Sequence, residues 1–440
     1  MRRTRKAKAP DSPPPSLRVA LASSLRQRPL LAIVGAFIVL GLCYALTVPT
    51  GGAPDELAHG NYVRWVAEHG SLPVIGQSKD QQEAHQPPLF YLLAVPLYLA
   101  GRHWSDAVAM ALLRGFCLLL GAMSVVLVYA VARETLPGRP PYVWLSTIAI
   151  SLLPMHVFIN SGVNSDALGE ALGTFTLLLC VLILRGPGVT WLQAVLYGLV
   201  LGLCLITKVM LGALVPILLV VLAYASARQG LPRRAIAGRV ATAIGACALV
   251  SGWWFGRNMA LYGDPLGASA YRAFFRGFAD PEWFASRGYG AVVYYGVCGR
   301  FMFQTFWGMF GHTNIPLSRG FYIALAVLTA AMAIGAGWFL YRVRRGPEAD
   351  GVERPALLAN LSFLGLLMLA HLAYLGTFMS AQFRYLYPAV APIGIAMAAG
   401  ILAWVPRRAR PWMPAIVAGL LVLFNMVALV LYVAPAPSAP

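Results

Sequence analysis

Long runs of apolar residues constrain this chain more than any other feature. Many of them extend over about 18 to 22 residues, enough to cross a hydrocarbon core of roughly 30 Å as a helix. Only helices and closed barrels can span lipid, and continuous runs of this kind lack the alternating pattern of a barrel. Charged residues make up only 11% of the 440 positions, too few to coat a soluble globule of this size. The sequence therefore predicts an all-α membrane fold, a polytopic bundle of about 11 transmembrane helices.

The predicted spans follow directly from these runs. They lie near residues 29–48, 106–132, 142–159, 168–185, 190–206, 209–227, 240–259, 320–341, 356–376, 386–405 and 412–434. We expect one transmembrane domain over residues 29–434, preceded by a disordered basic cytoplasmic tail over residues 1–28. A short outer tail over residues 435–440 would follow it.

The positive charges orient these spans. With the N-terminus inside, the N-terminal tail and the five short inner connections carry 22 of the 34 Lys and Arg residues. Those connections are 133–141, 185–189, 228–239, 342–355 and 406–411. Because basic residues favour the cytoplasmic side, the pattern predicts a multi-pass inner-membrane protein. Its two long outer loops would cover residues 49–105 and 260–319.

Two segments decide whether this topology holds. Residues 87–101 are apolar but too short for an ordinary span, and counting them would invert every later helix. We therefore expect a re-entrant or interfacial helix there. Residues 190–227 are broken only by Lys208, but one helix of that length would be about twice as long as a membrane is thick. The segment is predicted to be two helices.

The net charge of +18 could suggest nucleic acid, but its place between apolar runs indicates helix orientation, and no nucleic-acid partner is expected. The six cysteines lie in or beside apolar segments without a C-x-x-C pair, which argues against structural zinc and a disulfide framework. No Walker A, G-x-G-x-x-G or H-E-x-x-H motif occurs.

The first outer loop opens with a proline, two acids and a histidine. If Pro54 begins a helix, Asp55 and His59 share one face at a spacing of four residues. A carboxylate beside a histidine suits a general base, with Glu56 as a helper. The alternative is structural, because proline and acids at a helix start also complement the helix dipole.

A second polar group precedes the short apolar segment. Glu83, His85 and Gln86 stand directly before Pro87 and could hydrogen-bond a polar ligand. Equally, the segment could be a proline-rich stop that positions an interfacial helix.

The next outer connection carries Asn164, Ser165 and Asp166, which are typical helix-capping residues. Glu170 lies one turn further, inside the predicted span. A charged group in lipid is costly, so Glu170 should face a partner or a wet cavity.

Three cations lie at the outer ends of spans, namely Lys208, Arg257 and Arg384. Each could be a snorkelling side chain. Together they run against the orienting rule, and a shared anionic partner such as a lipid phosphate would explain them. His312, in the aromatic segment 306–314, is a further candidate, although interfacial packing is the competing explanation.

The order of these motifs resembles the GT-C glycosyltransferases, in particular bacterial relatives of the protein O-mannosyltransferases (glycosyltransferase family 39) and the lipid A aminoarabinose transferases. The segments that carry the resemblance are Pro54-Asp55-Glu56…His59, His85-Gln86-Pro87-Pro88-Leu89-Phe90-Tyr91, Asn164-Ser165-Asp166, Trp253-Trp254-Phe255-Gly256-Arg257-Asn258…Tyr262-Gly263-Asp264-Pro265 and Gln382-Phe383-Arg384-Tyr385-Leu386-Tyr387-Pro388. It covers most of residues 30–390. The chain departs from the family in carrying His85 where lysine is common, and in having one acid at Asn164-Ser165-Asp166 where many members carry two.

The resemblance implies GT-C-like outer loops, a polyprenyl-phosphate-sugar donor and an active site at the outer, periplasmic face. It implies Asp55 as the base, helped by Glu56, and Asp166 as the acid of the second loop. The predicted activity is inverting hexosyl or pentosyl transfer to a glycan, lipid or protein acceptor. The residues expected to bind substrate are His59, Glu83, His85, Gln86, Asp166, Glu170, Lys208, Arg257, Tyr262, His312 and Arg384.

Cations that hold a phosphate leaving group need no metal, although Asp55, His59 and Asp166 could hold a divalent ion. Membrane lipids are the other expected partners. A glycan ligase or polymerase that uses a lipid diphosphate is the main alternative. A transporter or flippase is the second, although it would place ionisable groups at mid-span.

Overall fold

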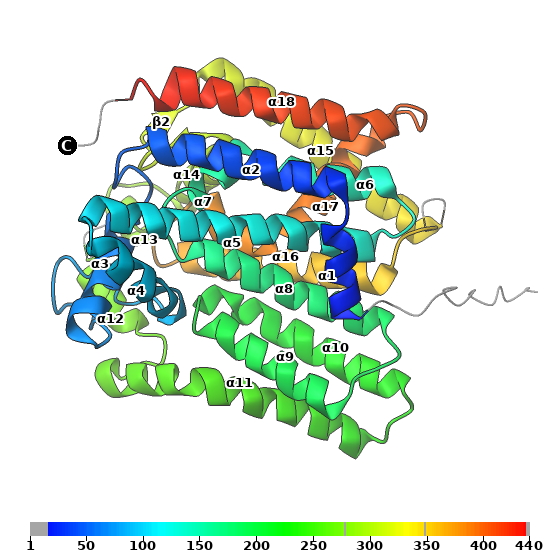
Figure 1. The fold of residues 1–440 in the computed structure, drawn as a ribbon, viewed down its shortest axis with the longest axis horizontal. Helices are drawn as coiled ribbons and strands as arrows, with labels where there is room; N and C mark the ends of the chain where they lie inside the picture. The colour runs from blue at the N-terminus through cyan, green and yellow to red at the C-terminus, as the bar shows by residue number, and fades with distance from the viewer. Residues whose placement is uncertain (1–15, 277–278, 347–348, 437–440) are drawn as a thin grey trace, which may run out of the picture.

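The computed structural model describes residues 16–276, 279–346 and 349–436, and most of these residues are helical (Figure 1). Within these ranges nine helices are long and apolar enough to cross a membrane. They are α2 (Arg28–Thr47), α5 (Asp106–Thr135), α8 (Asp166–Arg185), η1 with α10 (Val209–Ala213 and Leu214–Arg228), α11 (Arg233–Tyr262), α15 (Arg319–Arg345), α16 (Arg354–Leu375), η2 with α17 (Phe383–Ala389 and Val390–Ala403), and η3, α18 and η4 (Arg410–Trp412, Met413–Ala428 and Leu429–Val433).

The remaining two predicted spans take less regular forms. The span predicted at 142–159 consists of α6 (Pro140–Ser151) and α7 (Pro154–Asn160), which meet at a bend of 58°. Pro154 opens the second piece and cannot donate a backbone hydrogen bond across the break. The span predicted at 190–206 is α9 (Trp191–Leu205), a shorter apolar helix. The all-α membrane fold is thus confirmed.

The long helices lie roughly side by side, and the connections predicted to be basic gather at one end (Figure 1). We call this the basic end of the bundle. The opposite end holds the first long loop with α3 (Glu56–His69) and α4 (Leu89–Arg102), and also the C-terminal end of the described chain. The two groups of loops are therefore separated in space as the charge pattern predicted.

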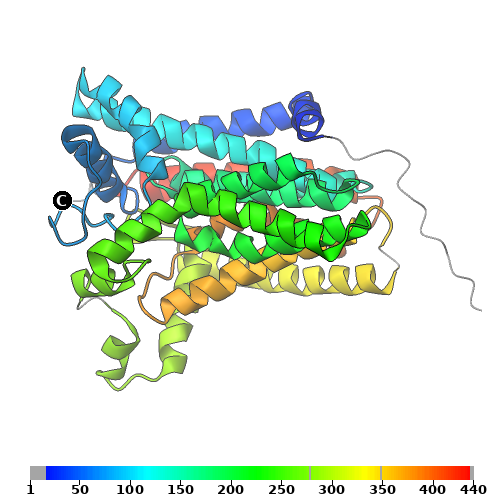
Figure 2. The same ribbon diagram turned by 90° about the horizontal axis from the view of Figure 1, so that it is seen from below.

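The second long loop lies at the same end as the first. It contains α12 (Ala268–Phe274), α13 (Pro281–Ala285), α14 (Ala291–Trp307) and a two-stranded hairpin of β1 (Met309–Phe310) and β2 (Ile315–Pro316). Figure 2 shows the yellow-green helices of this loop set crosswise to the long helices.

Helix α4 agrees with the expectation of a short segment that does not cross. Its 14 residues correspond to about 21 Å, less than the roughly 30 Å of a hydrocarbon core. It packs on α3 and α5, and the backbone N–H of Leu89 bonds to the Ile206 carbonyl at 2.9 Å. The helix therefore belongs to the end of the bundle that carries the long loops.

The described part of the N-terminal tail differs from the prediction of disorder. Residues Leu17–Leu25 form α1, and Arg133 of α5 donates to the Ser23 hydroxyl at 2.9 Å and to the Ala20 carbonyl at 3.0 Å. Ala20 is completely buried, so a small apolar face on this basic segment is sufficient to dock it. Residues 1–15 and 437–440 lie outside the described residues.

The interior of the bundle centres on α8, which is almost completely buried, whereas α11 and α15 are largely exposed to their surroundings. Small residues let the helices approach closely, as is common where lipid removes the hydrophobic drive between helices. A Cβ atom added at Gly198 would collide with the backbone of Ala243, where α9 crosses α11. The central position of α8 brings its first residue, Asp166, toward several other elements.

Candidate active site

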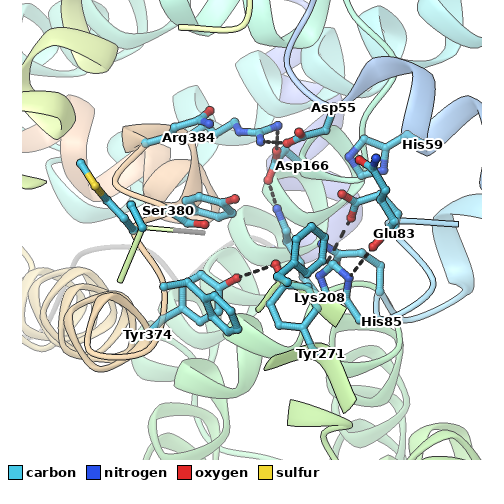
Figure 3. A pocket seen from close by; sticks show the side chains of 18 residues that line it. Asp55, His59, Glu83, His85, Asp166, Lys208, Tyr271, Tyr374, Ser380 and Arg384 are labelled. Atoms are coloured by element: carbon cyan, nitrogen blue, oxygen red, sulfur yellow. Dashed lines mark hydrogen bonds and ion pairs between the residues drawn. The ribbon is translucent and has the colours of Figure 1, made fainter. Parts of the chain in front are cut away.

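The long-loop end of the bundle contains a charged cavity of about 270 Å³. Helix starts, loops and helix breaks that are distant in sequence supply its walls (Figure 3). The predicted site residues that line it are Asp55, His59, Glu83, His85, Gln86, Asp166, Lys208 and Arg384. Eight of the predicted residues are thus brought together at one place.

Asp55 immediately precedes α3 in a left-handed backbone conformation, with φ of 59°. This conformation is uncommon outside glycine, and aspartate is among the residues that adopt it most readily. Helix α3 starts at Glu56 rather than at Pro54, and the Asp55 side chain makes no capping hydrogen bond to it. Instead the carboxylate forms an ion pair with Arg384 (Figure 3). The Asp55 carboxylate is therefore directed to Arg384 and is not used to cap the helix that follows it.

Asp166 is likewise free of a capping role, because its neighbour takes it. The Asn164 side chain accepts from the Ala167 backbone N–H at 3.1 Å. The Asp166 carboxylate pairs with Lys208 on one oxygen and with Nη1 of Arg384 on the other, at 3.3 Å. Two carboxylates and two cations thus form a connected row of ion pairs in the cavity wall.

Arg384 links the two carboxylates in this row of ion pairs. It lies in η2, its side chain is only 4% exposed, and it contacts both Asp55 and Asp166. Its buried Nε–H has no hydrogen-bond partner in the described part of the chain. A buried guanidinium donor without a partner is costly, and an anionic ligand oxygen would satisfy it.

The pKa values of the loop carboxylates differ because their neighbours differ. Burial acts to raise the pKa of Asp55, but the positive charge of Arg384 and a hydrogen bond from it outweigh this effect and lower the pKa. Burial raises the pKa of Glu83, which lies 4.0 Å from the His85 imidazole. Asp55 is therefore ionised at neutral pH, as a proton acceptor requires.

Both histidines of the cavity are held neutral. Burial lowers the pKa of His59 and of His85 to about 4. His59 Nδ1 lies 2.9 Å from the Tyr91 hydroxyl, and the His85 ring lies 4.0 Å from that of Tyr271. Neutral imidazoles can both donate and accept, which suits recognition of ligand hydroxyl groups.

Aromatic residues that the sequence reasoning did not select complete the cavity. They include Tyr271 and Phe275 from the second long loop, and Tyr374, Phe378 and Tyr385 from the region around η2. The Tyr374 hydroxyl donates to that of Tyr271 at 3.2 Å. Tyr385 could have been selected from the sequence, because it follows Arg384 in segment 382–388, which carries the family resemblance. Tyr271 is one of several aromatic residues in its loop, and no local pattern distinguishes it.

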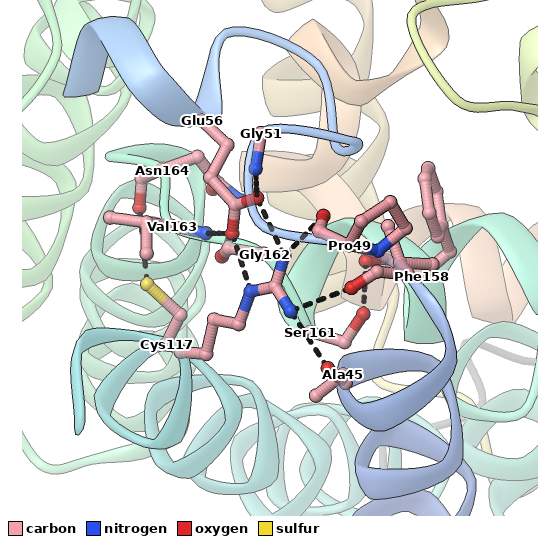
Figure 4. Close-up of polar contacts among 12 residues, drawn as sticks. Ala45, Pro49, Gly51, Glu56, Cys117, Phe158, Ser161, Gly162, Val163 and Asn164 are labelled. Atoms are coloured by element: carbon pink, nitrogen blue, oxygen red, sulfur yellow. Dashed lines mark hydrogen bonds and ion pairs between the residues drawn. The ribbon is translucent and has the colours of Figure 1, made fainter. Parts of the chain in front are cut away.

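Glu56 was predicted to assist catalysis, and its placement contradicts that role. The carboxylate is fully buried and does not line the cavity, and its polar contacts are drawn in Figure 4. It accepts two hydrogen bonds from Arg114 at 2.7 Å each, one from the Gly51 N–H at 2.8 Å and one from the Val163 N–H at 3.1 Å. All of its acceptor capacity is used within the protein.

The same cluster fixes the turn that carries Asp55. Arg114 also donates to the carbonyls of Ala45, Val48 and Pro49 at 2.7 to 2.9 Å, which ties the end of α2 to α5. The Glu56–Arg114 pair therefore holds both sides of the turn between α2 and α3. It is a positioning element for Asp55.

Four further predicted substrate-binding residues do not line the charged cavity. Glu170 is buried and accepts hydrogen bonds from His156 Nε2 at 2.8 Å and from Asn160 at 3.3 Å. Its partners are therefore side chains of the same bundle. Arg257 donates to the Pro73 carbonyl at 2.8 Å, and Tyr262 accepts from the Ile75 N–H at 3.0 Å. These two residues fasten the end of α11 to the first long loop.

His312 is the fourth of these residues. It lies in the turn of the β1–β2 hairpin, and its Nε2 is 2.6 Å from the Gly51 carbonyl. It lines a separate small cavity of about 40 Å³ next to the end of α2. Its role in the structure is to brace the same turn that carries Asp55.

The metal site considered for Asp55, His59 and Asp166 does not assemble. Among the described residues no group of three or more His, Cys, Asp and Glu side chains converges as metal ligands would. The reason is electrostatic, because Arg384 pairs with both aspartates and Lys208 pairs with Asp166.

Solved structures share this architecture. The archaeal oligosaccharyltransferase AglB from Archaeoglobus fulgidus, solved with an inhibitory peptide and a dolichol-phosphate, matches with a TM-score of 0.54 at 13% identity. The match covers 94% of this chain and 57% of that one. ArnT from Cupriavidus metallidurans bound to undecaprenyl phosphate matches with a TM-score of 0.49 at 14% identity, over 92% of this chain and 73% of that one.

The chain spans little more than half the length of the archaeal enzyme. No protein-family model and no curated protein matches the sequence. The likeness to the archaeal enzyme is one of fold alone.

Proposed function

We propose that this chain is a membrane glycosyltransferase that moves a sugar from a polyprenyl-phosphate carrier to an acceptor hydroxyl. One observation carries the proposal: Asp55, held away from its own helix, shares a cavity with the buried cations Arg384 and Lys208. The GT-C architecture supports this chemistry by analogy. The archaeal structure that shares the fold holds a dolichol-phosphate, a molecule of the same chemical class as the proposed donor.

The residues fit an inverting displacement. Asp55 takes the proton of the acceptor hydroxyl as its oxygen attacks the anomeric carbon. The bond from that carbon to the carrier phosphate breaks, and the electron pair leaves with the phosphate. Arg384, through its free Nε–H, and Lys208 stabilise the growing negative charge.

The remaining cavity residues suit the sugar. Neutral His59 and His85, together with Gln86, can hydrogen-bond hydroxyl groups. The rings of Tyr271, which lies against His85, and of Tyr374 add an apolar surface, with their hydroxyls as polar contacts. The cavity thus combines a phosphate region with a sugar region.

We place this cavity on the non-cytoplasmic face, because the opposite end carries the basic connections. Reporter fusions after Ser165 and Gly230 test the orientation. We expect the Ser165 fusion to report outside and the Gly230 fusion inside. The reverse result would contradict the proposed face.

The reaction itself is tested in proteoliposomes with a polyprenyl-monophosphate sugar as donor. Asp55→Asn should lower product formation by about 10²- to 10⁴-fold, the usual contribution of a general base. Asp106→Asn is the matched control, because Asp106 is exposed and outside the cavity. Unchanged transfer by Asp55→Asn would contradict the assignment of Asp55 as the general base. Turnover only with a diphosphate-linked donor would indicate a ligase or polymerase instead.

A further inference from the structure

The second long loop contains a helical hairpin with a small core of its own. Helices α13 and α14 meet around Phe284, Tyr294 and Cys298, in an apolar cluster separate from the main core of the bundle. The same cluster includes Leu375 and Ala381, so the hairpin packs on the end of α16 and on the segment that follows it. Figure 2 shows the hairpin extending sideways from the bundle.

Two contacts fix the level of this hairpin along the bundle. The Tyr294 hydroxyl donates to the Leu375 carbonyl at 2.5 Å, and the Met379 backbone N–H donates to the Ala279 carbonyl at 3.1 Å. Leu375 is the last residue of α16, one of the helices long and apolar enough to cross a membrane. Because α14 runs crosswise from this point, it lies near the level where the hydrocarbon core ends.

The part of the hairpin farthest from the bundle is apolar and exposed. We call residues 289–295 the hairpin tip. Val292 is 88% exposed, and Tyr289, Val293 and Tyr295 are each 44% to 51% exposed. The charge-free tip therefore presents four large apolar or aromatic side chains to its surroundings. An exposed apolar patch of this kind marks a surface that contacts another molecule or a membrane.

The charges on either side of the tip indicate which of these it contacts. Arg287 precedes the tip and Arg300 follows it, and both side chains are exposed. The Arg287 guanidinium carbon lies 3.6 Å from the centre of the Trp283 ring. Arginines at both ends of an apolar stretch, with tryptophan and tyrosine beside them, are typical of segments at a membrane surface. There the cations reach lipid phosphates and the rings lie at the level of the headgroups.

We propose that the α13–α14 hairpin is a membrane anchor that inserts its tip into the bilayer surface at the long-loop end. The partner is thus the lipid surface itself, although the sequence predicted an outer loop over this segment. This inference does not depend on the proposed reaction. It has a consequence for the site, because Ala279 and Met379, which are joined by a hydrogen bond, both line the charged cavity. Insertion of the tip would hold this part of the cavity wall at the membrane surface.

The test measures the depth of Val292 with the full-length protein in nanodiscs that hold one copy each. The fluorophore NBD is attached to Val292→Cys after Cys43, the half-buried native cysteine, is replaced by serine. The nanodisc phospholipids carry bromine atoms on their acyl chains, either near the headgroup or near the methyl end. We expect a loss of NBD emission, and a larger loss with the bromines near the headgroup.

Two labelled positions serve as controls. Leu249→Cys lies on α11, where Leu249 is 79% exposed, and its emission should also be lost. Lys79→Cys lies at an exposed position of the first long loop and should not be quenched. If Val292→Cys behaves as Lys79→Cys does, the tip is not inserted and the proposal is wrong. Shielding that appears only in nanodiscs with two copies would identify an interface between copies and would also overturn it.

A charge placed in the tip gives a second readout. Val293→Asp in the protein labelled at residue 292 should bring the quenching close to that of Lys79→Cys, because a carboxylate opposes insertion into hydrocarbon. Ser286→Asp adds the same charge at an exposed polar position of the hairpin outside the tip, and it should leave the quenching unchanged. Quenching that persists in full in Val293→Asp would contradict the insertion of the tip.

Discussion

Arg384 pairs with Asp55 although 329 positions separate the two residues in the chain. The same guanidinium contacts Asp166 at 3.3 Å, so η2 connects the start of α3 with the start of α8. Because of this arrangement, the protonation of Asp55 depends on a residue from the C-terminal part of the sequence. Four experimental consequences follow from this and neighbouring contacts.

Arg384→Gln should shift the acid side of the pH–rate profile to higher pH. The positive charge of Arg384 lowers the pKa of Asp55 against the opposing effect of burial, and without that charge burial raises the pKa. Asp55 would then be protonated at a higher pH than in the unaltered protein. Residual kcat/KM measured between pH 4 and 8 checks this. A profile shifted to lower pH would contradict the ion pair.

Lys208→Met should weaken donor use. Removing a buried cation that binds the donor phosphate should cost about 1.5 to 3 kcal/mol, which corresponds to a rise in donor KM of about ten- to 150-fold. Lys208→Arg should keep part of the activity because it keeps the charge. Lys79→Met, at an exposed position of the first long loop, serves as the control. Equal effects of the two methionine variants would rule out a specific role for Lys208.

Glu56→Gln and Arg114→Met should each destabilise the protein by about 3 to 5 kcal/mol, because each leaves a buried charge without its partner. The double variant should lose much less than the sum. The difference is measured as a double-mutant cycle of unfolding in detergent. The exposed pair Glu68–Arg102, at 2.9 Å, gives a control cycle with an expected coupling of about 0 to 1 kcal/mol. Additive losses for Glu56 and Arg114 would show that the two side chains are not coupled.

Stability should fall as the pH decreases from about 6.5 toward 4. Burial lowers the pKa of His59 to about 4 in the folded protein, so the unfolded chain binds more protons in this window. Its contribution to stability is therefore complete above the unfolded pKa and is lost as the pH falls. His59→Gln should reduce the pH dependence of the melting temperature. His85, whose pKa is lowered in the same way, should preserve part of it. An identical pH dependence in His59→Gln would show that His59 is not held neutral.

The sequence predicted the spans because hydropathy acts locally. A run such as 166–185 or 354–375 has nowhere to go but lipid or the bundle interior, whatever its neighbours are. The basic connections sorted the loops to two ends for the same reason, since each charge interacts with the membrane individually. Asp55, Asp166, Lys208 and Arg384 could therefore be assigned to one end without knowledge of their contacts.

The roles of individual side chains at that end required the tertiary structure. Asp55 and Glu56 are adjacent acids, yet one faces the cavity and the other is enclosed by Arg114. Glu170 was recognised as a costly buried charge, but its partner His156 lies on a helix whose direction depends on the bend at Pro154. Arg257 resembled Arg384 in sequence and instead binds backbone carbonyls.

The sequence by itself thus determined the membrane fold and the end of the bundle that carries the charged residues. It also determined the places of the spans, although those formed by α6 with α7 and by α9 are less regular than expected. Only the tertiary structure decided which charges pair and which remain available in the cavity. Burial in lipid is a property of each segment and can be read one segment at a time. Pairing depends on distances between segments such as α3, α8 and η2, which are set by packing across the whole bundle.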